Sequence, residues 1–183
     1  RRGRGRRPGV SFEPVLAAIR SEELRAVAAH WAVARGSKPM PAWRDIDPLQ
    51  LGRNIRYVWS WKYDRAADGF TRRLAGEEID LAFGKSMRGA AMRDFYSPQV
   101  YDLVFPRHRR VVTERGFMYG QGMLFAHMGR TVVGERIVMP LAEDGVTSDG
   151  IFGATLYRPM PLTADDRPLG PDYQPEQVTF FPL

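Results

Sequence analysis

The clearest periodic pattern lies in residues 54–64, NIRYVWSWKYD. Large hydrophobic side chains occupy every second position, and smaller or charged residues mostly fill the positions between them. The bulky set is Ile55, Tyr57, Trp59, Trp61 and Tyr63, and the intervening set is Arg56, Val58, Ser60, Lys62 and Asp64. A period of two residues is typical of a β-strand with one buried face. The turn sequence DRAADG (64–69) and a second β-rich run, FTRRLAG (70–76), then predict an antiparallel hairpin.

Helical spacing dominates the chain before this hairpin. Hydrophobic residues recur near every third or fourth position over 14–35, and Gly36 is suited to end such a helix. RDIDPLQLG (44–52) predicts one short helical turn with an aspartate cap, Pro48 at an early position and a terminal glycine. Asp45 and Asp47 are therefore interpreted as capping residues and not as a catalytic acid pair.

The segment after the hairpin is also mainly helical. EEIDLAFG (77–84) predicts a short helix, and residues 86–96 predict a loop with one helical turn. A longer helix is expected over 97–116, because Ser-Pro is a common helix start and Gly116 a common end. Pro106 lies inside this helix, where proline is expected to kink it.

Three β-rich segments close the body, at residues 117–128, 130–141 and 150–158. The helices thus cluster between the second and third strands, which predicts an α+β fold. We expect a five-stranded antiparallel sheet with helices on one face, plus the N-terminal helix. In this interpretation residues 1–13 are a flexible arm, 14–160 are a single domain and 161–183 are a proline-rich tail that wraps the body or a partner.

The charge is concentrated in the arm. The formal net charge is +6, but RRGRGRR (1–7) alone holds five of the 27 basic residues, and the other 22 nearly balance the 21 acidic ones. Such an arm can bind phosphate backbones without sequence preference. A nucleic-acid-associated accessory protein is therefore the alternative function, and a solvated terminus is the structural alternative.

Composition excludes several kinds of site. The chain has no cysteine, which excludes disulfides, thiolate metal sites, catalytic thiols and flavin–cysteinyl photochemistry. The three histidines show no metal-ligand spacing. No apolar run is long enough to span a membrane and no signal core is visible, so the cytoplasm is the expected location.

Residues 84–86, GKS, match the end of a phosphate-binding loop. The full motif needs a glycine at position 79, which is Ile79, and a helix start after it. Here the triplet follows a helix, so we expect its backbone not to bind phosphate. Gly76, Gly84 and Gly89 are instead expected to shape the turns around the short helix.

Four short motifs occur in order along the chain, and with the order of elements they resemble a PAS domain, in particular a bacterial subfamily of small single-PAS proteins. The motifs are PAWRDIDP (41–48), FTRRLAG (70–76), GKSMRG (84–89) and MPLAEDG (139–145), and their motif residues include Asp45, Asp47, Pro48, Arg73, Gly76, Gly84, Gly89 and Pro140. The resemblance covers about residues 22–158 and departs at Glu77, where the family tends to carry a small hydroxyl residue.

The resemblance implies a small pocket between the sheet and its helices. The pocket candidates on this basis are Phe83, Phe105, His108, Met123, Phe125 and Met139. Haem-binding PAS proteins take an axial histidine from the helix that here holds His108, but the neighbouring arginines favour a structural role. The identity of any ligand or cofactor stays unknown, and the sequence gives no support for haem or flavin.

Arg73 and the aromatic residues each have two interpretations. Arg73 either pairs with Asp45 or Asp47, which we favour, or points into the pocket toward an anionic ligand. The Trp59, Trp61 and Tyr63 side chains are either core beneath the helices or an outer face covered by the first helix or a second subunit. PAS sheets commonly dimerise, so the interface candidates are Trp31, Trp59, Trp61 and Tyr63.

No acid–base or nucleophile cluster can be recognised in the sequence. We therefore expect a cytoplasmic sensory or regulatory module and not an enzyme. It is expected to bind a small ligand and to signal through protein–protein association, as a homodimer and with an unknown partner.

Overall fold

The computed structural model describes residues 12–84, 86, 88–125, 131–158 and 175–183. In these residues the chain forms one antiparallel sheet of six strands in the order β2-β1-β5-β4-β3-β6. The strands are β1 (Val58–Asp64), β2 (Gly69–Ala75), β3 (Gly116–Phe125), β4 (Thr131–Leu141), β5 (Gly150–Arg158) and β6 (Gln177–Pro182). The α+β class and the antiparallel sheet are confirmed, and the sheet has one strand more than expected.

The predicted hairpin is β1 and β2, with Tyr63 opposite Phe70 and an irregularity between Ser60 and Trp61. The predicted strand was too long at its start. Ile55 and Tyr57 continue the alternating pattern but lie in a 3-10 helix, η2 (Gly52–Tyr57), which leads into β1. Both side chains pack against the core beneath the N-terminal helices, whereas Trp59 belongs to the core on the other face of the sheet.

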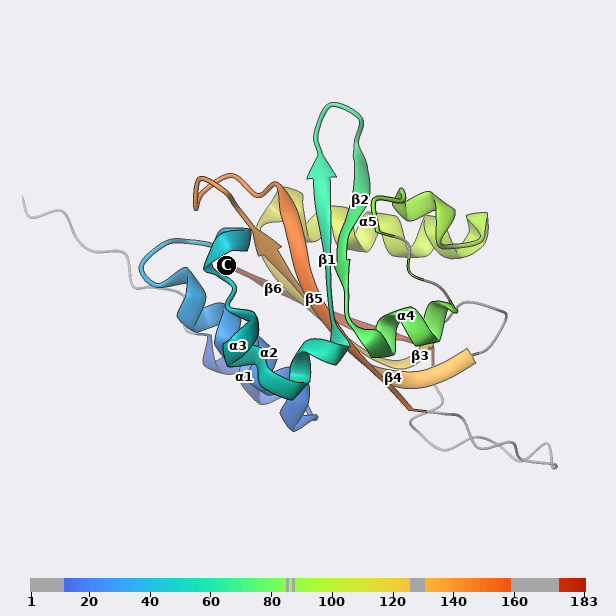
Figure 1. The fold of residues 1–183 in the computed structure, drawn as a ribbon, viewed down its shortest axis with the longest axis horizontal. Helices are drawn as coiled ribbons and strands as arrows, with labels where there is room; N and C mark the ends of the chain where they lie inside the picture. Colours follow the sequence, from blue (N-terminus) through green and yellow to red (C-terminus); the bar gives the residue numbers. More distant parts are fainter. Residues whose placement is uncertain (1–11, 85, 87, 126–130, 159–174) are drawn as a thin grey trace, which may run out of the picture.

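Helices cover both faces of the sheet (Figure 1). One face carries α1 (Glu13–Ala18), α2 (Glu22–Arg35), η1 (Trp43–Asp45), α3 (Pro48–Leu51) and η2. The other carries α4 (Glu77–Phe83), η3 (Met92–Asp94) and α5 (Pro98–Glu114). Each face has its own hydrophobic core because alternate residues of each strand point to opposite sides.

The N-terminal helix predicted over 14–35 is two helices. The break falls at Ile19–Ser21, where Ser21 precedes α2 in an extended conformation. Its backbone N–H and its hydroxyl both donate to Glu135 of β4, at 3.1 Å each. The hydrophobic spacing continues through Ile19, so the pattern alone does not reveal the break. Gly36 ends α2 as expected, with its N–H bonded to the Val33 carbonyl.

The capping predictions hold for both aspartates. Asp47 accepts a bond from the Leu49 N–H at the start of α3, and Asp45 accepts one from Ala42 beside η1. Asp45 also pairs with Lys38 at 2.7 Å. Pro48 is the first residue of α3. Pro140 lies in β4, and its carbonyl accepts the indole N–H of Trp31 at 2.9 Å.

The glycines around α4 have the expected structural roles. A side chain at Gly76 would place its Cβ 2.3 Å from the Ile55 carbonyl, so only glycine allows this close approach. Gly84 ends α4 with φ 74°, and Gly89 turns the chain with φ 81°. Because Gly84 lies at the C-terminal end of α4, its surroundings lack the helix N-terminus that grips phosphate.

The four aromatic interface candidates are buried within this chain. Trp31 packs on one face of the sheet, and Trp59, Trp61 and Tyr63 lie beneath α4 and α5 on the other. All four are at most 5% exposed. The expectation that they contact a second subunit is therefore wrong, and the alternative that they form core beneath the helices is the observed one for the three on β1.

The end of the proline-rich segment joins the sheet. β6 pairs antiparallel with β3, with Phe117 opposite Phe181. Residues 126–130, between β3 and β4, and most of the segment between β5 and β6 lie outside the described residues. β6 thus becomes an edge strand next to β3, and it brings the residue before it, Glu176, to the side of the sheet that carries α5.

Candidate ligand pocket between the sheet and helices α4 and α5

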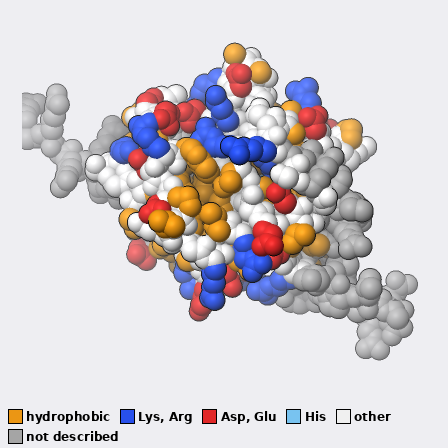
Figure 2. All heavy atoms as spheres, viewed as in Figure 1, with side chains coloured by type: hydrophobic (Ala, Val, Ile, Leu, Met, Phe, Trp, Pro, Cys, Tyr) orange, Lys and Arg blue, Asp and Glu red, His pale blue; other side chains and the backbone are white. Residues whose placement is uncertain are grey.

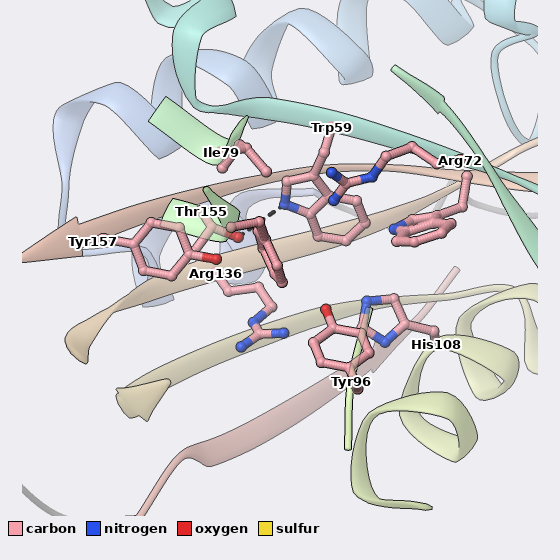
Figure 3. Close-up of a pocket in the computed structure, with 10 residues that line it drawn as sticks. Trp59, Arg72, Ile79, Tyr96, His108, Arg136, Thr155 and Tyr157 are labelled. Carbon is pink, nitrogen blue, oxygen red and sulfur yellow. Dashed lines mark hydrogen bonds between the residues drawn. The ribbon is translucent and has the colours of Figure 1, made fainter. Parts of the chain in front are cut away.

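A small cavity lies between the sheet and helices α4 and α5 (Figure 3). Its walls combine aromatic rings with buried polar and charged groups, contributed by β1, β2, β4, β5, both helices and the loop before α5. The lining residues are Trp59, Trp61, Arg72, Ile79, Phe83, Tyr96, His108, Arg136, Thr155 and Tyr157. The volume open to the centre of a water-sized sphere is about 10 Å³, which is roughly what one water molecule needs.

Arg72 lies in the wall at β2 and is only 4% exposed. It follows Phe70 by two residues, so the alternation of the strand directs both to the α4/α5 face. Its guanidinium carbon lies 4.8 Å from the ring centroid of Trp61, 5.4 Å from that of Phe83 and 4.3 Å from that of Phe95. The aromatic rings therefore contact the cation and stabilise it through their π faces.

The N–H donors at the edges of the same guanidinium are not all hydrogen-bonded. Nε and Nη1 of Arg72 have no hydrogen-bond acceptor among the described residues, and the nearest carboxylate oxygen, Oδ1 of Asp80, is 3.9 Å from Nη1. Burial lowers the pKa of Arg72, and Tyr96 and Asp80 offset this effect in part. The main chain at this point is fixed, because Arg72 exchanges backbone hydrogen bonds with Gly89 and Ala90.

Arg136 of β4 is the second buried arginine, at 5% exposure. Its Nε lies 3.2 Å from Oε1 of Glu176, and Nη1 of Arg107 donates to Oε2 of the same glutamate at 2.6 Å. Glu176 is itself buried, with 3% of its side chain exposed. Burial lowers the pKa of Arg136, but Glu176 and the neighbouring tyrosines outweigh this effect and hold it above its ordinary value.

The remaining polar groups of the cavity are neutral. Burial, with Arg136 nearby, lowers the pKa of His108 to about 3. Its Nδ1 lies 2.8 Å from the Val104 carbonyl oxygen. Because a carbonyl oxygen can only accept a hydrogen bond, Nδ1 carries the proton and Nε2 is unprotonated. Burial also raises the pKa of Tyr96 and of Tyr157, which stay protonated. Figure 3 shows both hydroxyl groups turned toward the cavity.

The Trp59 side chain lines the cavity and is held in place by a hydrogen bond and by ring packing. Its indole N–H donates to the Thr155 hydroxyl at 2.8 Å, drawn as the dashed line in Figure 3. Gly153 leaves room for the ring, since a Cβ there would lie 2.4 Å from the indole. The ring also packs against His108, with centroids 5.4 Å apart.

Two of the six predicted pocket residues, Phe83 and His108, line the cavity. Phe105 packs in the same core, against Phe70, but does not reach the cavity. The prediction for Met139 is wrong, because its side chain points to the opposite face of the sheet and packs in the core beneath α1 and α2. Met123 is not among the lining residues, and the side chain of Phe125 lies outside the described residues.

Arg73 takes neither of its predicted roles. Its guanidinium lies 5.1 Å from the ring centroid of Trp43, on the opposite face of β2 from the cavity. The arginine that faces the pocket is its neighbour, Arg72. The sequence contained a signal that Arg72 faces the pocket. Arg72 lies two residues after Phe70, so both belong to the same face of the predicted strand. Arg136 gave a similar signal as a charged residue inside the apolar run 130–141.

Other kinds of site are not found in the described part of the chain. No group of three or more histidine, aspartate or glutamate side chains there could hold a metal ion. No helix among the same residues has the length and apolar character needed to cross a membrane. His30 is not part of a metal-binding group among the described residues, and its Nε2 accepts a hydrogen bond from the Asp47 N–H at 3.1 Å.

Comparison with known families identifies the fold. The sequence profile of the PAS domain matches residues 19–156 of the 183-residue chain. The chain belongs to the PAS-domain family. A search of curated proteins found no match to this chain. PAS domains are generally non-catalytic sensory modules, and the cavity of this PAS domain lies where its sheet meets the helices of the matched region.

Proposed function

We propose that this PAS domain binds a small polar ligand in the cavity between its sheet and helices α4 and α5, and that it reports occupancy through association with another protein. The observation that carries the proposal is the buried guanidinium of Arg72, whose Nε and Nη1 have no acceptor among the described residues. A ligand with hydrogen-bond acceptors would satisfy these donors.

The charge of Arg72 lies inside a hydrophobic core, which has an energetic cost. Burying a cation costs several kcal/mol unless it is well paired, and buried polar groups are normally hydrogen-bonded. The same core is elsewhere built from apolar side chains such as Met92, Phe95 and Val104. Keeping an incompletely bonded arginine among them reduces stability, and such groups in a cavity are candidates for a binding role.

The position of the cavity supports a signalling role. Its walls come from two helices and four strands, so a ligand would contact elements that are far apart in the chain. A ligand that binds one arrangement of these elements better than another shifts the population toward it. Two of the strands that line the cavity, β4 and β5, also contact α2 on their other face, so they would connect occupancy to the N-terminal helices.

A hydrophobic patch on one face of the molecule supports the proposed association. Figure 2 shows hydrophobic side chains gathered at the centre of one face, with lysine, arginine and acidic side chains around them. Exposed apolar patches with polar rims suit contact with other proteins. The partner is unknown, and a second copy of the chain stays our expectation.

Native mass spectrometry of the protein purified from cells tests both halves of the proposal. We expect a non-covalent adduct that is lost on denaturation, and a subunit count above one. A protein that carries no adduct and stays monomeric at micromolar concentration would contradict it. The mass of the adduct would also restrict the identity of the ligand.

A second candidate, nucleic-acid association through residues 1–7, is supported by the five arginines in that segment. These residues lie outside the described part of the structure. Binding would be salt-dependent and lost on deletion of residues 1–7. Retention of binding after the deletion would exclude the arm as its source.

A further inference from the structure

We infer that the ligand is a small carboxylate, bound by Arg72 and Arg136 in competition with the carboxylate of Glu176. This inference rests on the proposed function and adds the chemical class of the ligand. It is carried by the charge balance of the cavity, the unsatisfied edges of Arg72, and the internal carboxylate that already lies beside Arg136.

The charges around the cavity do not balance. Among the described residues the cations are Arg72, Arg107 and Arg136, and the carboxylates facing them are Asp80 and Glu176. His108 and the two tyrosines are neutral near neutral pH. One positive charge is therefore left without a counter-charge, and a ligand with a single negative charge would complete the set.

The geometry of Arg72 favours a planar acceptor. Rings of Trp61, Phe83 and Phe95 contact its guanidinium, so further bonds must form at the edges. The free donors include Nε and Nη1. A carboxylate binds the edge of a guanidinium with two oxygens, which is a strong and directional arrangement.

Glu176 shows that the protein already places a carboxylate in this region. One of its oxygens is bound firmly by Arg107 at 2.6 Å. The other is 3.2 Å from Arg136 Nε but forms no hydrogen bond with it. Gly120 makes room for this oxygen, because a Cβ at that position would lie 2.5 Å from it. Arg136 is thus paired but incompletely bonded, and Glu176 is a competitor that can be replaced.

The size of the cavity explains why competition is needed. A volume of about 10 Å³ admits one water-sized group, so a carboxylate of three or more heavy atoms needs additional space. Movement of the Glu176 side chain away from Arg136 would provide space next to the cation. Because Glu176 directly precedes β6, its displacement would also act on the start of the edge strand.

Indole N–H signals in ¹H–¹⁵N NMR spectra provide a local test on the full chain. Trp59 and Trp61 line the cavity, whereas Trp31 lies on the opposite face and is an internal control. Titration with formate and acetate near neutral pH is compared with formamide and acetamide, their neutral analogues. Sodium chloride at the same ionic strength sets the baseline.

We expect formate or acetate to shift the Trp59 and Trp61 signals in a saturable way, with little change at Trp31. The amides and chloride should have no comparable effect. Glu176→Gln should bind the carboxylate about tenfold more tightly, and Arg72→Met should lose the response. Arg93→Met, which replaces an exposed arginine, is the matched control and should behave as wild type.

Two results would overturn the inference. Equal shifts with amides or chloride would show that carboxylate is not the recognised group, and no carboxylate response in either wild type or Glu176→Gln would show that it is not bound. Failure of the proposed function is recognised separately, because a neutral molecule that co-purifies and shifts the Trp59 signal would leave the proposed function intact.

Discussion

Arg72 and Trp61 are cross-strand partners in the β1–β2 hairpin, and the guanidinium carbon of Arg72 lies 4.8 Å from the ring centroid of Trp61. This pair places a cation inside the core that α4 and α5 form on the sheet. The cation has aromatic contacts but incomplete hydrogen bonding, so its contribution to folding and its contribution to binding should differ in sign.

Replacing Arg72 by methionine is expected to stabilise the protein. Methionine has a similar length, keeps contact with the rings and removes the desolvation cost, so the free energy of unfolding should rise by about 1–2 kcal/mol. Urea denaturation of wild type, Arg72→Met and Arg72→Ala measures this. The alanine variant should be less stable than Arg72→Met because it leaves a cavity. A methionine variant less stable than wild type would mean that the contacts of the cation with the aromatic rings outweigh its desolvation cost.

Glu176→Gln is expected to destabilise the protein. It leaves Arg136 buried without its carboxylate, and breaking a buried ion pair in this way costs about 3 kcal/mol. The loss should appear in thermal unfolding. A carboxylate ligand at about 100 times its Kd should restore about 2.7 kcal/mol. Arg110–Glu114 is an exposed ion pair on α5, and Glu114→Gln is the control that should change stability little.

His108 should make the protein sensitive to acid. Its pKa is about 3 in the folded protein against 6.5 for the free side chain, so the unfolded chain binds a proton first as the pH falls. The stabilisation is complete above about pH 6.5 and is lost toward pH 3, at about 1.4 kcal/mol per pH unit. Stability measured between pH 7 and pH 5 should therefore fall more steeply in wild type than in His108→Gln. Parallel profiles would contradict a buried neutral imidazole.

Gly76→Ala should disturb the turn that joins β2 to α4. The added Cβ would lie 2.3 Å from the Ile55 carbonyl, which is backbone and cannot rotate away. The expected loss is about 3 kcal/mol. At Gly69 the nearest atom to an added Cβ is 3.8 Å away, so Gly69→Ala is the control and should stay within about 0.5 kcal/mol of wild type. Equal effects at both positions would exclude the close approach as the cause.

Local sequence patterns predicted most of the elements. The hairpin, α4 with its terminal Gly84, α5 and strands β3 to β5 each follow from periodicity and from turn or capping residues within one segment. The errors arose where a local pattern continued past a tertiary boundary. Ile55 and Tyr57 keep the two-residue period of β1 but lie in η2. Ile19 keeps the helical spacing although α1 ends at Ala18 and α2 begins only after Ser21.

The cavity was harder to predict because it depends on which face of its strand each residue occupies and on contacts between residues far apart in the sequence. A shift of one residue in a strand changes the face, which separates Arg72 in the cavity from Arg73 beside Trp43. The pairing of Arg136 with Glu176 joins residues that are far apart in sequence. No pattern in the proline-rich segment revealed that its end would form β6 and bring a carboxylate to this site.

The most direct test of the central claim compares the ligand that co-purifies with wild type, Arg72→Met and Arg93→Met in native mass spectra recorded under identical conditions. We predict an adduct on wild type and on Arg93→Met, and none on Arg72→Met, although that variant is folded and more stable. An adduct of equal abundance on Arg72→Met would contradict the claim that Arg72 binds the ligand.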